Sequence, residues 1–174
     1  MQKLNNIYET DEMELRVALY MQNFFDIFYL NQGLQHIIDK AREVFGHPML
    51  VHDISYKVLA SSYDINDIIA FTEDENGNKY INEETINYIH SNYDLMKEIR
   101  KAGSYNLIKE SDPLNGVLLS LIKTDGIEVA KLVIYEAGTQ FSPIVIKLAD
   151  RFSQLLSIEL QKNNLFGRDK NLII

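Results

Sequence analysis

Residues 45–61, FGHPMLVHDISYKVLAS, turn the chain from a helix into a β-hairpin. Before them, residues 33–45 repeat apolar side chains at spacings of three, four and seven, which predicts a helix. Gly46 stands where a left-handed residue ends a helix, and Pro48 prevents its continuation. The two halves of the stretch are then strand-like on either side of a polar turn. We therefore expect a helix packed against a pair of antiparallel strands.

Further helices are predicted on both sides of this hairpin. Residues 11–30 are apolar on more than one face and begin at Asp11, whose side chain can cap the first turn. Residues 63–103 are irregular and helical. The final helix begins at Ser142, an N-cap residue followed by proline, and runs to about residue 163, beyond which the tail has no clear period.

Three more strands are expected at residues 105–109, 116–123 and 127–136. The dipeptide Asp125-Gly126, between the last two, is a strong hairpin signal. Every neighbouring pair of strands can close through a short antiparallel connection, except across the helical middle. The predicted fold class is therefore α+β, with one five-stranded antiparallel sheet. The first two helices and the last would cover one face, and the helical middle would cover the other.

Composition excludes several classes of function. The chain has 174 residues, 46% of them hydrophobic, and no cysteine, which excludes disulfides, cysteine nucleophiles and thiolate zinc sites. A formal net charge of −8 disfavours nucleic acid, whose phosphates require clustered Lys and Arg. No apolar run approaches the roughly 20 residues of a membrane span, and residues 1–11 lack the basic start of a secretory signal. We expect a cytosolic protein that binds neither nucleic acid nor membrane.

Three segments carry a more specific pattern than the order of elements. They are LQHIIDKA at residues 34–41, FGHP at 45–48 followed by VHDISYKVLA at 51–60, and LLSIELQKN at 155–163. This pattern resembles the sensor domain of PucR/CdaR-type bacterial transcription regulators, within the GAF/PAS class of small-molecule sensor domains. In that family a helix leads through a Gly-x-Pro step into a strand, an Asp-x-Ser-aromatic-Lys turn and a return strand.

The resemblance implies a GAF-like sensor domain over residues 33–163. A dimerisation helix would occupy residues 1–32, and residues 164–174 would form a tail or linker. The implied role is a small-molecule sensor that regulates transcription through dimer helices. His47 replaces a small polar residue of the pattern, and the helix-turn-helix module of such regulators does not occur in these residues. The alternative is a ligand-free dimerisation module of the same fold.

The candidate ligand residues would lie between the sheet and the helical middle. His52 alternates with the apolar Val51 along its strand, so it would face the middle or solvent. Tyrosine offers an apolar ring and one polar tip, which suits a small pocket, although ordinary packing explains any single one equally well. The expected ligand-binding residues are His52, Tyr63, Tyr88, Tyr93, Arg100 and Tyr105.

No motif indicates catalysis, a cofactor or a metal. The four histidines form no HxH, HExxH or HxxxH pair, and there is no GxSxG elbow or phosphate-binding glycine loop. Residues 72–83 match parts of a calcium loop, but Thr72 replaces its first carboxylate and Lys79 adds a cation. A solvated turn is the better interpretation of that segment. The prediction is a binding module rather than an enzyme, with no cofactor.

The first and last helices carry more apolar side chains than one sheet face can absorb. A helix that is apolar on several sides needs a second partner, and large exposed patches are rare on monomers. We therefore expect a homodimer with a two-fold helical interface. The residues predicted at this interface are Phe24, Phe28, Leu148, Phe152 and Leu155.

Overall fold

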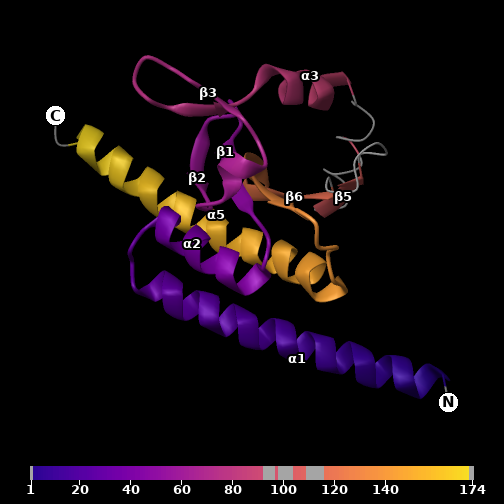
Figure 1. The fold of residues 1–174 in the computed structure, drawn as a ribbon. Helices are drawn as coiled ribbons and strands as arrows, with labels where there is room; N and C mark the ends of the chain where they lie inside the picture. Colours follow the sequence, from indigo (N-terminus) through magenta and orange to yellow (C-terminus); the bar gives the residue numbers. More distant parts are fainter. Residues whose placement is uncertain (1, 92–96, 98–103, 109–115, 173–174) are drawn as a thin grey trace.

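The computed structural model describes residues 2–91, 97, 104–108 and 116–172 (Figure 1). Its elements, in chain order, are α1 (Gln2–Tyr29), α2 (Leu34–Phe45), β1 (Met49–Asp53), β2 (Val58–Ser61), the 3-10 turn η1 (Ile65–Asp67), β3 (Phe71–Glu73), β4 (Lys79–Ile81), α3 (Glu83–Ser91), β5 (Ser104–Ile108), β6 (Gly116–Thr124), β7 (Ile127–Tyr135) and α5 (Pro143–Leu172).

The main sheet has the strand order β2-β1-β7-β6-β5, and all of its neighbouring strands are antiparallel. The β6–β7 connection turns at Asp125 and Gly126, both with positive φ, as the Asp-Gly signal predicts. β1 pairs with β7 although some seventy residues separate them in the chain, which places the residue 45–61 hairpin beside the centre of the sheet.

Both faces of the central strands are buried. Along β7, Ala130, Leu132 and Ile134 belong to one apolar core, whereas Val133 belongs to a second core on the opposite face. This double burial explains the nearly continuous apolar sequence of β6 and β7, since each strand has no solvent-facing side over most of its length. The first face is covered by α2 and α5, and the second face by the segment from η1 to α3 (Figure 1).

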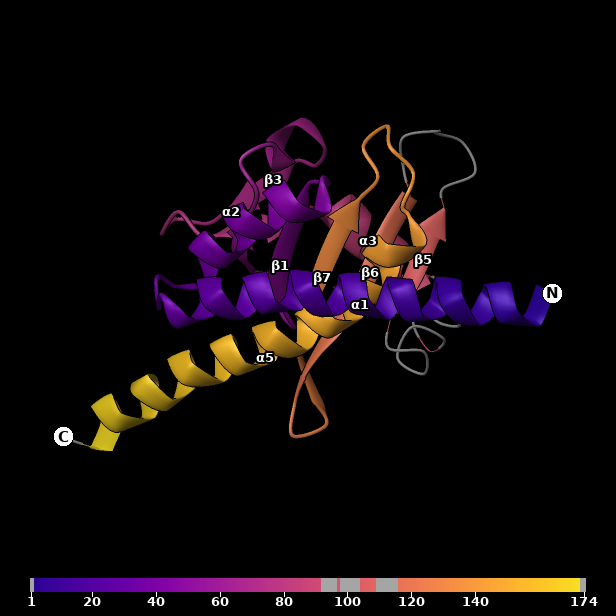
Figure 2. The same cartoon turned by 90° about the horizontal axis from the view of Figure 1, so that it is seen from below.

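The helix α1 does not lie on the sheet, contrary to the prediction. It packs against α2 and α5, which lie between it and the first face, so it forms an additional outer layer (Figures 1 and 2). Three phenylalanine rings join these helices, with centroids 5.8 Å apart for Phe24 and Phe45, 4.6 Å for Phe24 and Phe152, and 5.5 Å for Phe45 and Phe152. The apolar side chains on the inner side of α1 are therefore buried within one chain.

The same packing corrects the residues predicted at the dimer interface. The rings of Phe24 and Phe152 are fully buried between the helices of a single chain. Lys162 lies over the Phe28 ring, 4.7 Å from its centroid, which partly covers that side chain as well. Four of the five predicted interface residues are buried inside the chain, where they stabilise the fold and a second chain cannot reach them: Phe24, Leu148, Phe152 and Leu155.

Helix ends follow local signals only in part. α2 ends as predicted, with Gly46 left-handed at φ 73° and its N–H donating to the Arg42 carbonyl. The N-terminus of α5 is also as predicted, since the Val145 N–H donates to the Ser142 hydroxyl. However, α1 starts at Gln2 rather than Asp11, and α5 continues to Leu172 rather than ending near residue 163.

The middle segment contains a hairpin that the sequence analysis missed. β3 and β4 pair as a separate two-stranded sheet within the segment predicted to be helical. Its turn is built on Asp74, whose carboxylate accepts the backbone N–H groups of Asn76 and Asn78 at 2.9 Å. The predicted turn is therefore present, and Asp74 stabilises it as an Asx turn. Within the segment predicted to be irregular and helical, residues 92–96 and 98–103 lie outside the described residues.

We expect Phe152→Ala to lower the free energy of unfolding by about 3–5 kcal/mol, since it removes the ring shared by Phe24 and Phe45 and leaves a cavity. The control is Ile158→Ala on the same helix, which is 48% exposed and should change stability by about 0.5 kcal/mol. Urea unfolding followed by circular dichroism measures both changes. Equal effects of the two substitutions would contradict this description of the helical core.

Candidate ligand-binding site

A buried polar cluster lies on the second face of the sheet. His52 of β1 and Lys131 of β7 are direct partners in the strand register, and they are only 2% and 7% exposed. Their neighbours on this face are apolar and include Leu50, Leu121 and Val133. Burying such polar groups costs free energy unless they are hydrogen-bonded or paired, so their partners determine what the cluster can bind.

Lys131 is held by an ion pair. Its Nζ lies 2.7 Å from Oε1 of Glu128, and the two side chains are 8% and 18% exposed. The same ammonium group lies 6.0 Å from the centroid of the Tyr56 ring, within range of a cation–π interaction. A buried cation is a group that a further hydrogen-bond acceptor can engage.

His52 is held in its neutral form. Burial lowers the pKa of the imidazole, and the positive charge of Lys131 lowers this pKa further, against the opposing effect of nearby acceptors and carboxylates. The Nδ1–H donates to the Asp53 carbonyl at 2.8 Å. In this tautomer Nε2 has a lone pair and acts as a hydrogen-bond acceptor. The cluster therefore offers one cation and one neutral acceptor side by side.

Tyr56 connects this cluster to the covering layer. Its ring stacks on His52, with centroids 5.5 Å apart, and its hydroxyl lies 2.9 Å from Nε2 of His90 on α3. Its carbonyl also accepts the N–H of Ile81 on β4 at 3.0 Å. One side chain and its backbone thus join the sheet, β4 and α3.

The conformation of Tyr56 is strained. Its φ of 66° lies in the left-handed region, which is costly for an aromatic residue. The Asp53 carboxylate stabilises this turn by accepting the N–H groups of Ser55 and Lys57 at 2.9 and 3.0 Å. Strain of this kind persists only where the surroundings determine it, and it concentrates at functional sites. The Asp-x-Ser-Tyr-Lys turn therefore aims the Tyr56 ring at His52.

The structure brings together only part of the predicted ligand set. His52 faces the covering layer, as expected if Val51 is in the core. Tyr63 is 75% exposed and lies over Arg42, away from the second face. Tyr88 lies on α3 and is 39% exposed. Tyr93 and Arg100 fall outside the described residues, and Tyr105 lies on β5, where only the backbone is described.

Sequence reasoning missed Tyr56, His90, Lys131 and Glu128. Lys131 had a recognisable signal, because it interrupts the apolar run VAKLVIY at residues 129–135 in the middle of a strand. His90 had no such signal, since its approach to Tyr56 depends on how α3 crosses the sheet. In the described part of the chain, no group of three or more His, Asp or Glu side chains is arranged to hold a metal ion.

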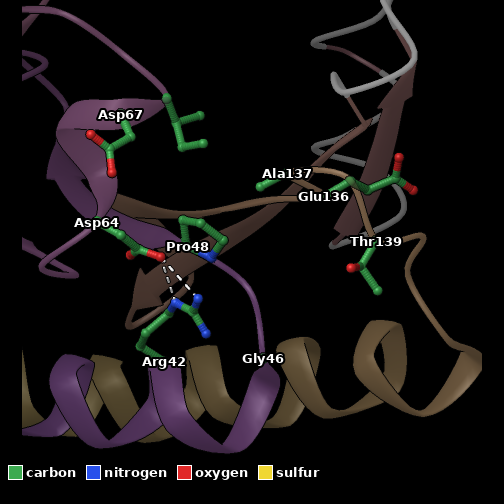
Figure 3. Close-up of a pocket in the computed structure, with 9 residues that line it drawn as sticks. Arg42, Gly46, Pro48, Asp64, Asp67, Glu136, Ala137 and Thr139 are labelled. Atoms are coloured by element: carbon green, nitrogen blue, oxygen red, sulfur yellow. Dashed lines mark hydrogen bonds and ion pairs between the residues drawn. The ribbon is translucent and has the colours of Figure 1, made fainter.

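A separate polar pocket opens at one end of the sheet, with a cavity volume of about 240 Å³ (Figure 3). Asp64 and Asp67, beside and within η1, form one side, and Glu136, Ala137 and Thr139 form the opposite side. The remaining lining residues come from the last turn of α2, the segment between α2 and β1, and the residue after η1: Arg42, Gly46, Pro48 and Ile68.

Two of the four charged side chains that line this pocket form an ion pair with each other. Arg42 pairs with Asp64 through Nε and a terminal guanidinium nitrogen, each 2.9 Å from the carboxylate, and the Ser62 hydroxyl donates to the other oxygen at 2.8 Å. Burial favours a raised pKa for Asp64, but the hydrogen bonds from Arg42 and Ser62 outweigh it, so the pKa is lowered. The pair ties η1 to α2. The remaining carboxylates, Asp67 and Glu136, make the rest of the pocket acidic.

No protein-family model matches the chain, and no curated protein matches it. Among solved structures, it is similar to the cofactor-binding GAF domain of the nutrient sensor CodY from Clostridium difficile, with a TM-score of 0.52 at 15% sequence identity. The match covers 74% of this chain and 84% of that one. The chain therefore has a GAF-like α+β fold, which confirms the predicted fold at that level. Among the described helices, none combines the length and the apolar character needed to cross a membrane.

We expect the free energy of unfolding to fall more steeply between about pH 7 and pH 5 in the native protein than in His52→Gln. The folded-state pKa of His52 is lowered, so the unfolded chain takes up this proton first as the pH drops below about 6.5. Gln keeps a donor for the Asp53 carbonyl but does not titrate. Urea unfolding across this pH range measures both slopes, and identical slopes would contradict a buried neutral His52.

Proposed function

We propose that the chain is the small-molecule-sensing domain of a cytosolic transcription regulator related to the PucR/CdaR type, and that it is not an enzyme. The segments at residues 34–60 and 155–163 support this relationship, and the GAF-like fold is compatible with it. The similarity to a sensor domain is an analogy of fold, and a fold alone does not define a function. The proposal therefore depends on a site.

The observation that carries the proposal is the burial of Lys131 and His52 on the face covered by α3. A site of a few polar groups set among apolar side chains is typical of small-ligand pockets. Retaining a cation and a strained tyrosine there costs stability, and such costs are common where a site serves function. The expected ligand carries a hydrogen-bond acceptor for Lys131 and a donor for Nε2 of His52.

The proposed mechanism is a shift between two populated states. An acceptor group of the ligand would replace Glu128 at Lys131 and contact the Tyr56 ring that stacks on His52. Because the Tyr56 hydroxyl also bonds to His90, the position of α3 would differ between the free and bound states. A ligand acts in this way only through a difference in its affinity for the two states.

One observation favours the alternative, a ligand-free dimerisation module. Much of the described interface between the sheet and its cover is filled by the protein's own apolar side chains. Leu50, Ile65 and Ile81 are at most 3% exposed there, and Leu119 and Val133 are at most 5% exposed. A site filled in this way would need no ligand for stability.

Thermal unfolding of the purified protein with separate panels of amino acids, organic acids, nucleobases and sugars tests the proposal. A true ligand at 100 times its Kd adds about 2.7 kcal/mol, which corresponds to roughly 5–10 °C in Tm for a domain of this size. We expect Lys131→Met to abolish this increase. The matched control is Lys123→Met on the neighbouring strand, where the side chain is exposed, and Asp67→Asn probes the polar pocket.

The outcomes separate the two sites and the two functions. A rise in Tm that is lost in Lys131→Met and kept in Lys123→Met and Asp67→Asn supports the proposed site. Loss in Asp67→Asn alone would assign the ligand to the polar pocket instead. If none of the compounds raises the Tm of the native protein, the ligand-free module is the better description.

A further inference from the structure

A β-bulge interrupts β7 at Val129. In the pairing of β7 with β6, Ala130 is opposite Ile122 and Glu128 is opposite Lys123. Val129 is therefore an extra residue, because the residues on either side of it pair with consecutive residues of β6. A bulge of this kind bends its strand and changes the direction of the side chains beside it. The side chains before the bulge are therefore out of phase with those after it.

The bulge brings Glu128 and Lys131 to one face of the sheet. Side chains alternate along a strand, so two residues that are three positions apart point to opposite faces of a regular strand. With the extra residue between them, Oε1 of Glu128 lies 2.7 Å from Nζ of Lys131. This ion pair therefore depends on the irregular register of β7.

A second bulge lies on the other side of the same position in the sheet. In the pairing of β1 with β2, His52 is opposite Val58, whereas the residue before His52 is opposite Ala60. Leu59 is therefore the extra residue of this pair of strands. Since His52 is also the direct partner of Lys131, both bulges lie close to these two side chains. Bulges are frequent beside binding and catalytic sites, where they redirect a side chain.

Stability alone does not account for this ion pair. The side chains of Lys131 and Glu128 are only 8% and 18% exposed, so both charges lose most of their water. Replacing a buried ion pair by apolar residues is often neutral or stabilising. Apolar side chains do fit this face, because Leu121, opposite Lys131 on β6, and Val133 both belong to its core. A ligand that uses the cation would explain why the charges are kept.

The charges at this position favour a ligand with one carboxylate. Glu128 brings one negative charge to Lys131, and burial lowers the pKa of His52, so that the imidazole is neutral. A ligand carboxylate in place of Glu128 would keep the same charge balance. A doubly charged group such as phosphate would bring a second negative charge into a largely buried site, which is costly unless that charge is also paired.

We propose that Lys131 is a carboxylate-binding subsite, that Glu128 occupies it in the free protein, and that the ligand is a small monocarboxylic acid that displaces Glu128. The identity of the ligand rests on the proposed function, whereas the subsite itself does not. The Lys131 ammonium has three N–H donors, so the ligand replaces one charge-assisted hydrogen bond by another. Glu128 is thus a competitor built into the chain, and it reduces the affinity for the ligand.

Chemical rescue of Glu128→Ala tests the subsite. The substitution removes a carboxymethyl group, which acetate matches in size and charge, and acetamide is the neutral control. Thermal unfolding followed by circular dichroism at pH 7 and constant ionic strength measures Tm. Acetate at ten times its Kd should raise the Tm of this variant by about 3–6 °C, whereas acetamide should not. Glu128→Ala combined with Lys131→Met should not respond to acetate.

The matched control is Glu14→Ala, which removes the same group from an ion pair with Lys147 on α5. Glu14 is 43% exposed there, so water already solvates the lysine and acetate should not raise the Tm. If acetate stabilises Glu128→Ala no more than acetamide does, or stabilises Glu14→Ala or the double variant equally, the subsite is overturned. If Glu128→Ala does not fold, the same titration on Glu128→Gln decides, because Gln keeps the shape of the side chain without its charge.

The proposed function can fail separately from the subsite. It fails if none of the compound panels raises the Tm of the native protein, and an acetate response of Glu128→Ala would then still support the subsite. Conversely, a compound without a carboxylate may raise the native Tm in a way that Lys131→Met abolishes. That result would overturn the monocarboxylic acid as the ligand and would leave the sensor function standing.

Discussion

The contact among Phe24, Phe45 and Phe152 determines how this protein is layered. It joins one ring from each of α1, α2 and α5, the first two consecutive in the chain and the third about a hundred residues later. Since α2 and α5 already cover the first face of the sheet, the third ring can only bring α1 against their outer side. The rotation of α1 about its axis is set by this contact. Burial of Phe24 directs the opposite stripe, with Leu15 and Leu19, toward solvent.

Local signals account for the elements that were predicted well. Gly46 and Pro48 end α2, Asp125-Gly126 closes the β6–β7 hairpin, and Ser142 starts α5, because each acts through its own backbone geometry or hydrogen bonds. Local signals gave the wrong element or boundary where a second backbone conformation was also compatible with the same residues. Asp11 is a good N-cap residue, yet α1 continues through it. The β3–β4 hairpin has short strands with exposed charged side chains, so its alternation was hidden, although Asn76-Gly77 marks its turn.

The candidate site could be predicted from the sequence only in part, for a different reason. Predicting that His52 and Val51 lie on opposite faces of the sheet needed only the alternation of side chains along a strand. Placing Lys131 beside it required the β1–β7 register, a pairing across some eighty residues that no local pattern specifies. The residues predicted at the dimer interface are buried within one chain for a related reason. A helix that is apolar on several sides indicates that it has two partners, but only the packed structure shows which stripe belongs to which partner.

The second face and α1 lie on opposite sides of the same sheet, and α2 and α5 lie between the sheet and α1. His52 and Lys131 point to the covering layer, whereas Val51 and Leu132, their neighbours along the strands, belong to the core shared with α2 and α5. Any influence of a ligand on association would have to pass through these strands and helices into α1. Such coupling is reciprocal, so a ligand that strengthened association would itself bind more tightly to the associated form, by the same factor.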